Sequence, residues 1–166
     1  MTEYYGTPAA FKTYWQARGN SAVVGYDDST IVTPALLVAS EWLDAAFLGR
    51  FGGLKIGGRD QVREWPRSDV QDVYGYAIPS DVPPREIEAA TYEAALRQIV
   101  TPGTFFKDYT PGKYKSVSIS GALSVEYATG SAYDFQTQMP QIAAILAPIL
   151  TGYSNTSSLS SCTARV

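Results

Sequence analysis

The chain has 166 residues, of which 45% are hydrophobic and 17% charged, and its net charge is −3. This length predicts one domain with a hydrophobic core and an appended arm. The chain has no histidine and one cysteine, Cys162. These counts exclude Ser-His-Asp and Cys-His catalysis, His-ligated zinc and an intramolecular disulfide. The acidic balance does not favour nucleic-acid binding, and the low charge content favours a surface partly covered by partners.

The first helix is predicted to begin at the capping pair Thr7 and Pro8 and to end at Gly19. Its aromatic residues share one face. Residues 20–30 contain turn formers and predict a loop, with a short extended piece at 22–24.

The second helix has the clearest pattern. Thr33 is the predicted cap and Pro34 the first helical residue. An apolar stripe at helical spacing then predicts a buried face, which consists of Leu36, Ala39, Leu43, Ala46 and Phe47.

Residues 49–82 are rich in Gly, Pro, Asp and Arg and predict a long loop, with a short helix from about Asp60 to Trp65. The glycines at 49–58 lack the phosphate-binding loop pattern, so we interpret them as a flexible loop. The basic residues of this loop are candidates for contact with DNA phosphates or with acidic protein surfaces: Arg50, Lys55, Arg59 and Arg63.

The tripeptide Trp65-Pro66-Arg67 allows two interpretations. Trp65 can be buried while Arg67 pairs with a carboxylate, which would pin the loop to the body of its own subunit. The alternative is a latch between subunits. Two nearby aromatics, Tyr74 and Tyr76, are either interface anchors or, beside the arginines, platforms for bases of single-stranded DNA.

The third helix is predicted from a cap at Asp81 to about Val100, and Pro102-Gly103 ends it. Its apolar positions cover more than one face, which indicates burial on two sides. Glu93 and Arg97 are spaced to form an exposed ion pair.

From residue 116 to 127 apolar and polar residues alternate, which predicts β structure. We expect one unbroken strand of about 40 Å, at roughly 3.3 Å per residue. The alternative is a hairpin with a three-residue connection at 120–122, which would match Ile119 with Leu123 and Val117 with Val125. We hypothesise that the apolar residues add a strand to a neighbouring copy or to another protein: Val117, Ile119, Leu123, Val125 and Tyr127.

A short apolar helix is predicted from Pro140, with a kink at Pro148. Its apolar face consists of Ile142, Ile145, Leu146 and Ile149. This face would lie in a groove on an adjacent subunit or another protein, or pack within its own subunit. Residues 151–166 form a Ser/Thr-rich tail. The longest apolar run, residues 142–150, is too short to span a membrane.

Together these patterns predict a mainly α protein, a small bundle of about four helices with long loops and a strand or hairpin arm near residues 115–128. The expected division is a helical body at 1–112 and a C-terminal arm at 113–166. We find no catalytic residues, no metal ligands and no cofactor motif, and expect no enzyme activity.

The order of several segments resembles the head–tail connector proteins (neck adaptor or head-completion proteins) of tailed bacteriophages, some of which are described as DnaT-like ssDNA-binding proteins. The segments are "ALLVASEWLDAAFLGRFGG", "DQVREWPRS", "IPSDVPPREIEAATYEAALRQI", "YKSVSISGALSVEY" and "MPQIAAILAPIL". The resemblance covers residues 4–152 and contains no catalytic signature.

This resemblance implies a structural virion protein, assembled in the host cytoplasm and located in the neck. It implies a ring, usually of twelve copies, between the portal protein and the next neck or tail-terminator protein, with genomic double-stranded DNA passing through the lumen. Two alternatives remain: a single-stranded DNA-binding protein of phage replication, and another ring protein of the tail, such as a tail terminator, which predicts a more β-rich body.

Overall fold

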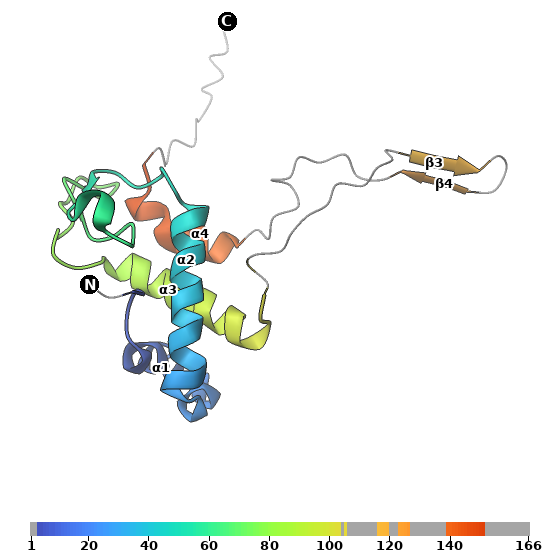
Figure 1. Ribbon diagram of the computed structural model, residues 1–166, viewed down its shortest axis with the longest axis horizontal. Coiled ribbons are helices and arrows are strands. Elements are labelled where there is room, and N and C mark those ends of the chain that lie inside the picture. The colour runs from blue at the N-terminus through green and yellow to red at the C-terminus, as the bar shows by residue number, and fades with distance from the viewer. Residues whose placement is uncertain (1–2, 104, 106–115, 120–122, 127–138, 152–166) are drawn as a thin grey trace, which may run out of the picture.

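The computed structural model describes residues 3–103, 105, 116–119, 123–126 and 139–151. Within them the helical body consists of α1 (Pro8–Gln16), α2 (Thr33–Ala46), α3 (Arg85–Val100) and α4 (Pro140–Leu146). Helix α2 crosses α3, with α1 near the first end of α2 and α4 near its last (Figure 1). The prediction of a mainly helical bundle with a small β arm is therefore confirmed.

Helix α1 begins as predicted, because the Thr7 side chain accepts a hydrogen bond from the backbone N–H of Ala10. The Trp15 indole N–H donates to the backbone carbonyl of Tyr92, which ties α1 to α3. The extended piece predicted after α1 is wrong, since this segment forms a 3₁₀ helix, η1 (Ser21–Gly25).

Helix α2 is preceded by one π-helical turn, η2 (Asp28–Val32). The carboxylate of Asp27 accepts hydrogen bonds from the hydroxyls of Ser29 and Thr30 and from their backbone N–H groups. These bonds, those from the hydroxyls first, lower the pKa of Asp27 to about 2. The prediction that Thr33 is the cap is wrong, because Asp27 already satisfies the free N–H groups one turn earlier.

Helix α3 starts after Pro84, so Asp81 does not cap it. Glu93 is 2% exposed and accepts hydrogen bonds from the Tyr14 hydroxyl (3.1 Å) and from Arg97 (3.0 Å). The expected exposed ion pair is therefore a pair with a buried carboxylate. Burial and the nearby Glu93 charge raise the pKa of Tyr14 to about 12.

Helix α4 returns to the body and packs against α3. Its last turn tightens into a 3₁₀ helix, η4 (Ala147–Ile149), at the position of the kink predicted for Pro148. The core joins all four helices, and its fully buried side chains include Phe11, Leu36, Leu43, Ile87, Ile142 and Leu146.

Strands β3 (Ser116–Ile119) and β4 (Leu123–Glu126) form an antiparallel hairpin. Its register pairs Val117 with Val125 and Ile119 with Leu123. This is the register of the hairpin alternative, and the single long strand is wrong. Figure 1 shows the hairpin standing apart from the helical body.

A second antiparallel pair, β1 (Leu54–Lys55) and β2 (Arg67–Ser68), lies in the long loop between α2 and α3. The helix predicted to end at Trp65 is reduced to a single 3₁₀ turn, η3 (Gly58–Asp60). The reason is Pro66, which disfavours helical geometry in the residue before it.

Candidate interaction surface

The segment between α2 and α3, residues 47–84, is here called the 47–84 loop. Of the eleven large hydrophobic side chains exposed in the described residues, eight lie in this loop. Gathered apolar side chains on a surface are typical of binding sites. The eight are Leu48, Leu54, Ile56, Val62, Val73, Tyr74, Tyr76 and Val82.

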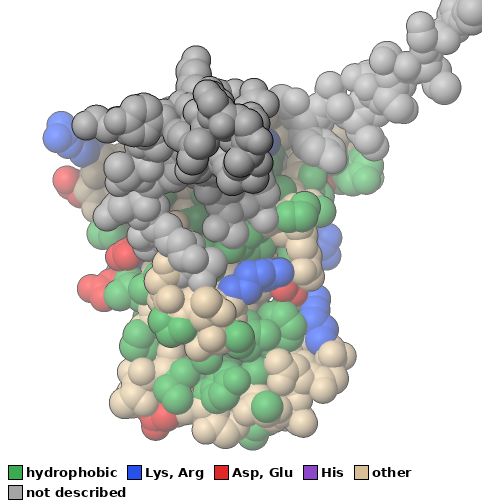
Figure 2. Space-filling view, turned by 90° about the vertical axis from the view of Figure 1, so that its right-hand side faces the viewer, with side chains coloured by type: hydrophobic (Ala, Val, Ile, Leu, Met, Phe, Trp, Pro, Cys, Tyr) green, Lys and Arg blue, Asp and Glu red, His purple; other side chains and the backbone are tan. Residues whose placement is uncertain are grey.

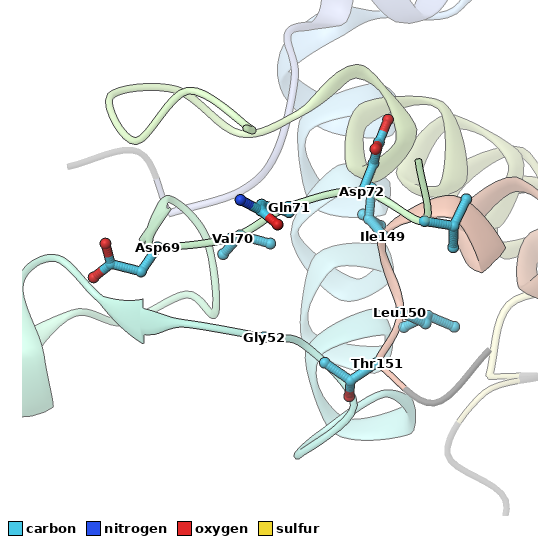
Figure 3. Close-up of a pocket in the computed structure, with 9 residues that line it drawn as sticks. Gly52, Asp69, Val70, Gln71, Asp72, Ile149, Leu150 and Thr151 are labelled. Carbon is cyan, nitrogen blue, oxygen red and sulfur yellow. The ribbon is translucent and has the colours of Figure 1, made fainter. Parts of the chain in front are cut away.

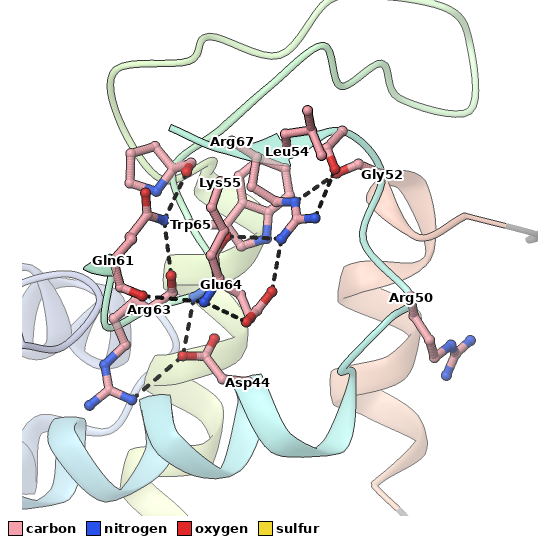
Figure 4. Close-up of polar contacts among 12 residues, drawn as sticks. Asp44, Arg50, Gly52, Leu54, Lys55, Gln61, Arg63, Glu64, Trp65 and Arg67 are labelled. Atoms are coloured by element: carbon pink, nitrogen blue, oxygen red, sulfur yellow. Dashed lines mark hydrogen bonds and ion pairs between the residues drawn. The ribbon is translucent and has the colours of Figure 1, made fainter. Parts of the chain in front are cut away.

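Arg67 holds the inner side of the loop together (Figure 4). Its guanidinium donates to the backbone carbonyls of Gly52 (2.7 Å) and Gly53 (2.9 Å) and to the carboxylate of Glu64 (2.8 Å). Gly53 has a φ of +63°, and a side chain there would collide with the carbonyl oxygen of Ser68. Arg67 therefore fixes two distant parts of the loop to each other.

Glu64 also binds Lys55, whose ammonium lies 2.8 Å from the second carboxylate oxygen. The buried Gln61 completes this cluster by donating to the backbone carbonyls of Arg63 and Pro66. These side chains find hydrogen-bond partners in spite of the irregular backbone, whereas the buried indole N–H of Trp65 has none within the described residues.

Arg63 is 7% exposed and points into the body. It donates to the backbone carbonyl of Glu3 and lies 3.5 Å from the carboxylates of Glu41 and Asp44 on α2. Burial raises the pKa of Asp44. Arg63 therefore serves to attach the loop to α2 and to the N-terminal segment.

Trp65 is buried at the centre of this attachment and packs edge-on against Phe51, with 5.7 Å between ring centroids. Its backbone N–H donates to the Tyr5 hydroxyl, which in turn donates to Asp44. Of the two interpretations of Trp65, Pro66 and Arg67, these contacts are those of a loop pinned to its own subunit.

The four basic residues considered for phosphate contact divide into two pairs. Arg63 and Lys55 are bound to carboxylates within the chain. Arg50 lies over the ring of Phe47 and points away from the cluster (Figure 4). Arg59 is exposed and forms no ion pair with any described residue. Only Arg50 and Arg59 are thus available to an external partner.

The outer side of the loop presents a tight turn that carries Tyr74 and Tyr76, with 78% and 72% of their side chains exposed. One carboxylate oxygen of Asp72 accepts hydrogen bonds from the backbone N–H groups of both tyrosines, each 2.9 Å long. Gly75 between them has a φ of +85°, which suits glycine. The hydrogen bonds that shape the turn join backbone N–H groups to the Asp72 carboxylate. The two tyrosine rings take no part in them and are exposed to solvent.

Two shallow hollows flank this turn. One has a volume of about 350 Å³ and lies between Gly52, the segment 69–73 and residues 149–151 (Figure 3). The other, about 300 Å³, is here called the tyrosine groove. Its walls are mostly apolar and include Tyr76, Ile78, Val82, Pro84 and Ile149.

The apolar residues of α4 lie inside the subunit. Ile142, Leu146 and Ile149 are buried in the core, and Ile145 packs against it. Of the two placements expected for this apolar face, the structure shows packing within its own subunit. In the hairpin, the register places Val117, Ile119, Leu123 and Val125 on one face. Tyr127 and the tail from residue 152 lie outside the described residues.

The described part of the chain offers no cluster of three or more His, Cys, Asp or Glu side chains that could hold a metal ion. Within the same residues, no helix has the length and hydropathy of a membrane span.

A family model described as "Putative DnaT-like ssDNA binding protein" matches residues 2–165. The match covers nearly the whole chain, body and arm together. No curated protein and no solved structure matches the chain.

Proposed function

The chain belongs to this DnaT-like ssDNA-binding protein family, and we propose that its role is structural, as a head-to-tail adaptor in the neck of a tailed bacteriophage. Twelve copies would form a ring between the portal protein and the next neck or tail protein. Genomic double-stranded DNA would pass through the lumen. The segment order described above supports this proposal, since it resembles that of head–tail connector proteins.

The observation that carries the proposal is the hairpin. Strands β3 and β4 stand apart from the body in Figure 1 and place four apolar residues on one face by their register. A two-stranded hairpin alone in water is only marginally stable. A second surface that covers the four apolar residues would stabilise such a hairpin, and a neighbouring subunit or neck protein can supply one.

The side of the body that faces the hairpin is consistent with contacts between subunits. Figure 2 looks at the molecule from that side and shows hydrophobic side chains gathered over the lower part of the body, with a few charged side chains among them. Subunit interfaces of permanent assemblies are more apolar than ordinary surfaces. Since α4 serves the core, we assign the portal and neighbour contacts to the hairpin and the 47–84 loop.

The electrostatics suit a channel for DNA. The net charge is −3, and Lys55, Arg63 and Arg67 are all paired with carboxylates of the same subunit. Each free cation facing the lumen would hold a phosphate and slow the DNA. A ring with Arg50 and Arg59 turned away from the lumen would let DNA slide without binding it.

The helical body also favours an adaptor over a tail terminator, for which the sequence analysis expected more β structure. In the described residues the strands amount to two short pairs, and helices supply most of the core.

The family description supports a second candidate, binding of single-stranded DNA. Its aromatic platforms would be Tyr74 and Tyr76, but the arginines expected beside them, Arg63 and Arg67, are engaged in the loop interior. A titration of labelled oligothymidylate at rising salt separates the two candidates. The DNA-binding function predicts an affinity that falls steeply with salt, and the adaptor predicts no such complex.

The adaptor proposal is tested by quantitative mass spectrometry of purified tailed particles. We expect this chain in every tailed particle, in about the same number of copies as the portal protein. Its absence from the particles would refute the proposal.

A further inference from the structure

The turn that carries Tyr74 and Tyr76 is held rigidly as well as exposed. The backbone N–H of Asp72 donates to the carbonyl of Tyr76, and that of Ile78 donates to Val70, both at 2.9 Å. A third bond, from Val73 to the carbonyl of Pro148, fixes the turn to η4. Side chains on a fixed backbone lose little entropy on binding, and tyrosine is a frequent interface anchor.

The tyrosine groove lies directly beside this turn, because Tyr76 forms part of its wall. Ile78, Val82 and Ile149 supply apolar walls, and the volume of about 300 Å³ is enough for aliphatic side chains. A partner that fits here brings one or two exposed aliphatic residues on a short segment.

The groove is acidic on balance. Its lining contains Asp72 and Glu86 and one basic residue, Arg85, which pairs with Glu86. Residues 69–84 add Asp69 and Asp81 and contain no lysine or arginine. This charge repels a phosphate backbone and attracts a basic segment. The fitting partner is therefore a basic protein segment with exposed aliphatic side chains.

The same chain carries such a segment at residues 50–59, which contain no acidic residue. Arg50 and Arg59 supply its available positive charge, because Lys55 is paired with Glu64. Leu54 and Ile56 within it are 71% and 52% exposed. We propose that the tyrosine groove of one copy receives residues 50–59 of a second copy. This inference rests on the proposed ring and names the surfaces that join its subunits.

The two surfaces can be disabled separately. The groove variant is Tyr74→Ser with Tyr76→Ser, and the segment variant is Leu54→Ser with Ile56→Ser. All four side chains are exposed, so both variants should keep the circular dichroism and melting temperature of the wild-type chain. The matched control is Val100→Ser on α3, whose side chain is 69% exposed.

Sedimentation velocity over a concentration series measures self-association of the full chain. We expect each variant to weaken it by about tenfold or more, since central aromatic and aliphatic anchors carry most of the affinity of an interface. The control should associate like the wild type. Mixed in equal amounts, the two variants should form a heterodimer, because one intact groove then meets one intact segment.

Three results would overturn the inference: a wild-type chain that stays monomeric at every soluble concentration, variants that associate like the wild type, or an oligothymidylate complex that only the groove variant loses. The proposed function is tested independently, by the presence of the chain in tailed particles. If the chain is present in tailed particles but its variants associate normally, this interface is refuted and the adaptor proposal is not.

Discussion

The hydroxyl of Tyr5 donates a 2.6 Å hydrogen bond to Asp44, although 39 positions separate the two residues in the sequence. The same oxygen accepts a hydrogen bond from the backbone N–H of Trp65 (3.1 Å). One buried hydroxyl therefore joins the N-terminal segment, α2 and the 47–84 loop. Burial and the Asp44 carboxylate raise the pKa of Tyr5.

Replacing Tyr5 by Phe removes this junction without changing the ring. We expect the free energy of unfolding to fall by about 1–3 kcal/mol, because the N–H of Trp65 and the carboxylate of Asp44 lose a buried partner. Urea denaturation of the full chain measures the effect. Tyr4→Phe is the matched control, since the Tyr4 hydroxyl has no hydrogen bond within the described residues. Equal effects of the two substitutions would contradict the junction.

Replacing Arg67 by Lys keeps the charge but loses the planar group that reaches two carbonyls and Glu64 at once. We expect a loss of about 1–3 kcal/mol in the free energy of unfolding. Arg59→Lys, at an exposed position of the same loop, should change it by less than about 0.5 kcal/mol. An Arg67→Lys variant with an unchanged free energy of unfolding would show that the loop is held by other contacts.

The sequence predicted the elements whose signals are local. Thr7 and Pro8 mark the start of α1, and the alternation around residues 120–122 contains the hairpin register. The sequence also contains a signal for the cap at Asp27 that the analysis above did not use, because Ser29 and Thr30 follow it at the spacing of a capping turn. The unbroken alternation of residues 116–127 also fits one long strand, whereas the cross-strand matching of apolar residues fits the hairpin.

The polar interior of the loop was beyond sequence reasoning. Arg67 binds backbone carbonyls of Gly52 and Gly53, and any residue has such a carbonyl, so no pattern marks the partners. Arg63 likewise reaches the carbonyl of Glu3, sixty positions away. The tyrosine groove lies between η4 and the 47–84 loop. The sequence spacing of its residues does not show that these two segments meet.

The cap at Asp27 predicts a specific acid response. Its folded pKa is about 2 against an ordinary value of 3.8, so its contribution to stability is complete above pH 3.8 and is lost as the pH falls to about 2. In Asp27→Asn the side-chain oxygen still caps but does not titrate. Between pH 4 and 2 the free energy of unfolding should therefore fall more steeply in the wild type than in the variant. Parallel curves would contradict the assignment of the cap.

The apolar face of the hairpin predicts a loss of assembly without a loss of folding. Val117→Asp together with Val125→Asp places charges on that face, whereas Ser118→Asp together with Ser124→Asp places them on the other. All variants should unfold like the wild type, because the helical body contains the core. The yield of tailed particles in complementation should fall about tenfold or more for the valine pair only. Equal yields from the two double variants would show that the apolar face of the hairpin is not part of the interface.

Cryo-electron microscopy of purified tailed particles, focused on the neck, tests the central claim most directly. The adaptor account predicts a ring of this chain between the portal and the next neck protein. The hairpin at residues 116–126 of each copy should contact a neighbouring subunit, and DNA should occupy the lumen. A neck in which every density is filled by other proteins, with none matching this helical body, would contradict the account.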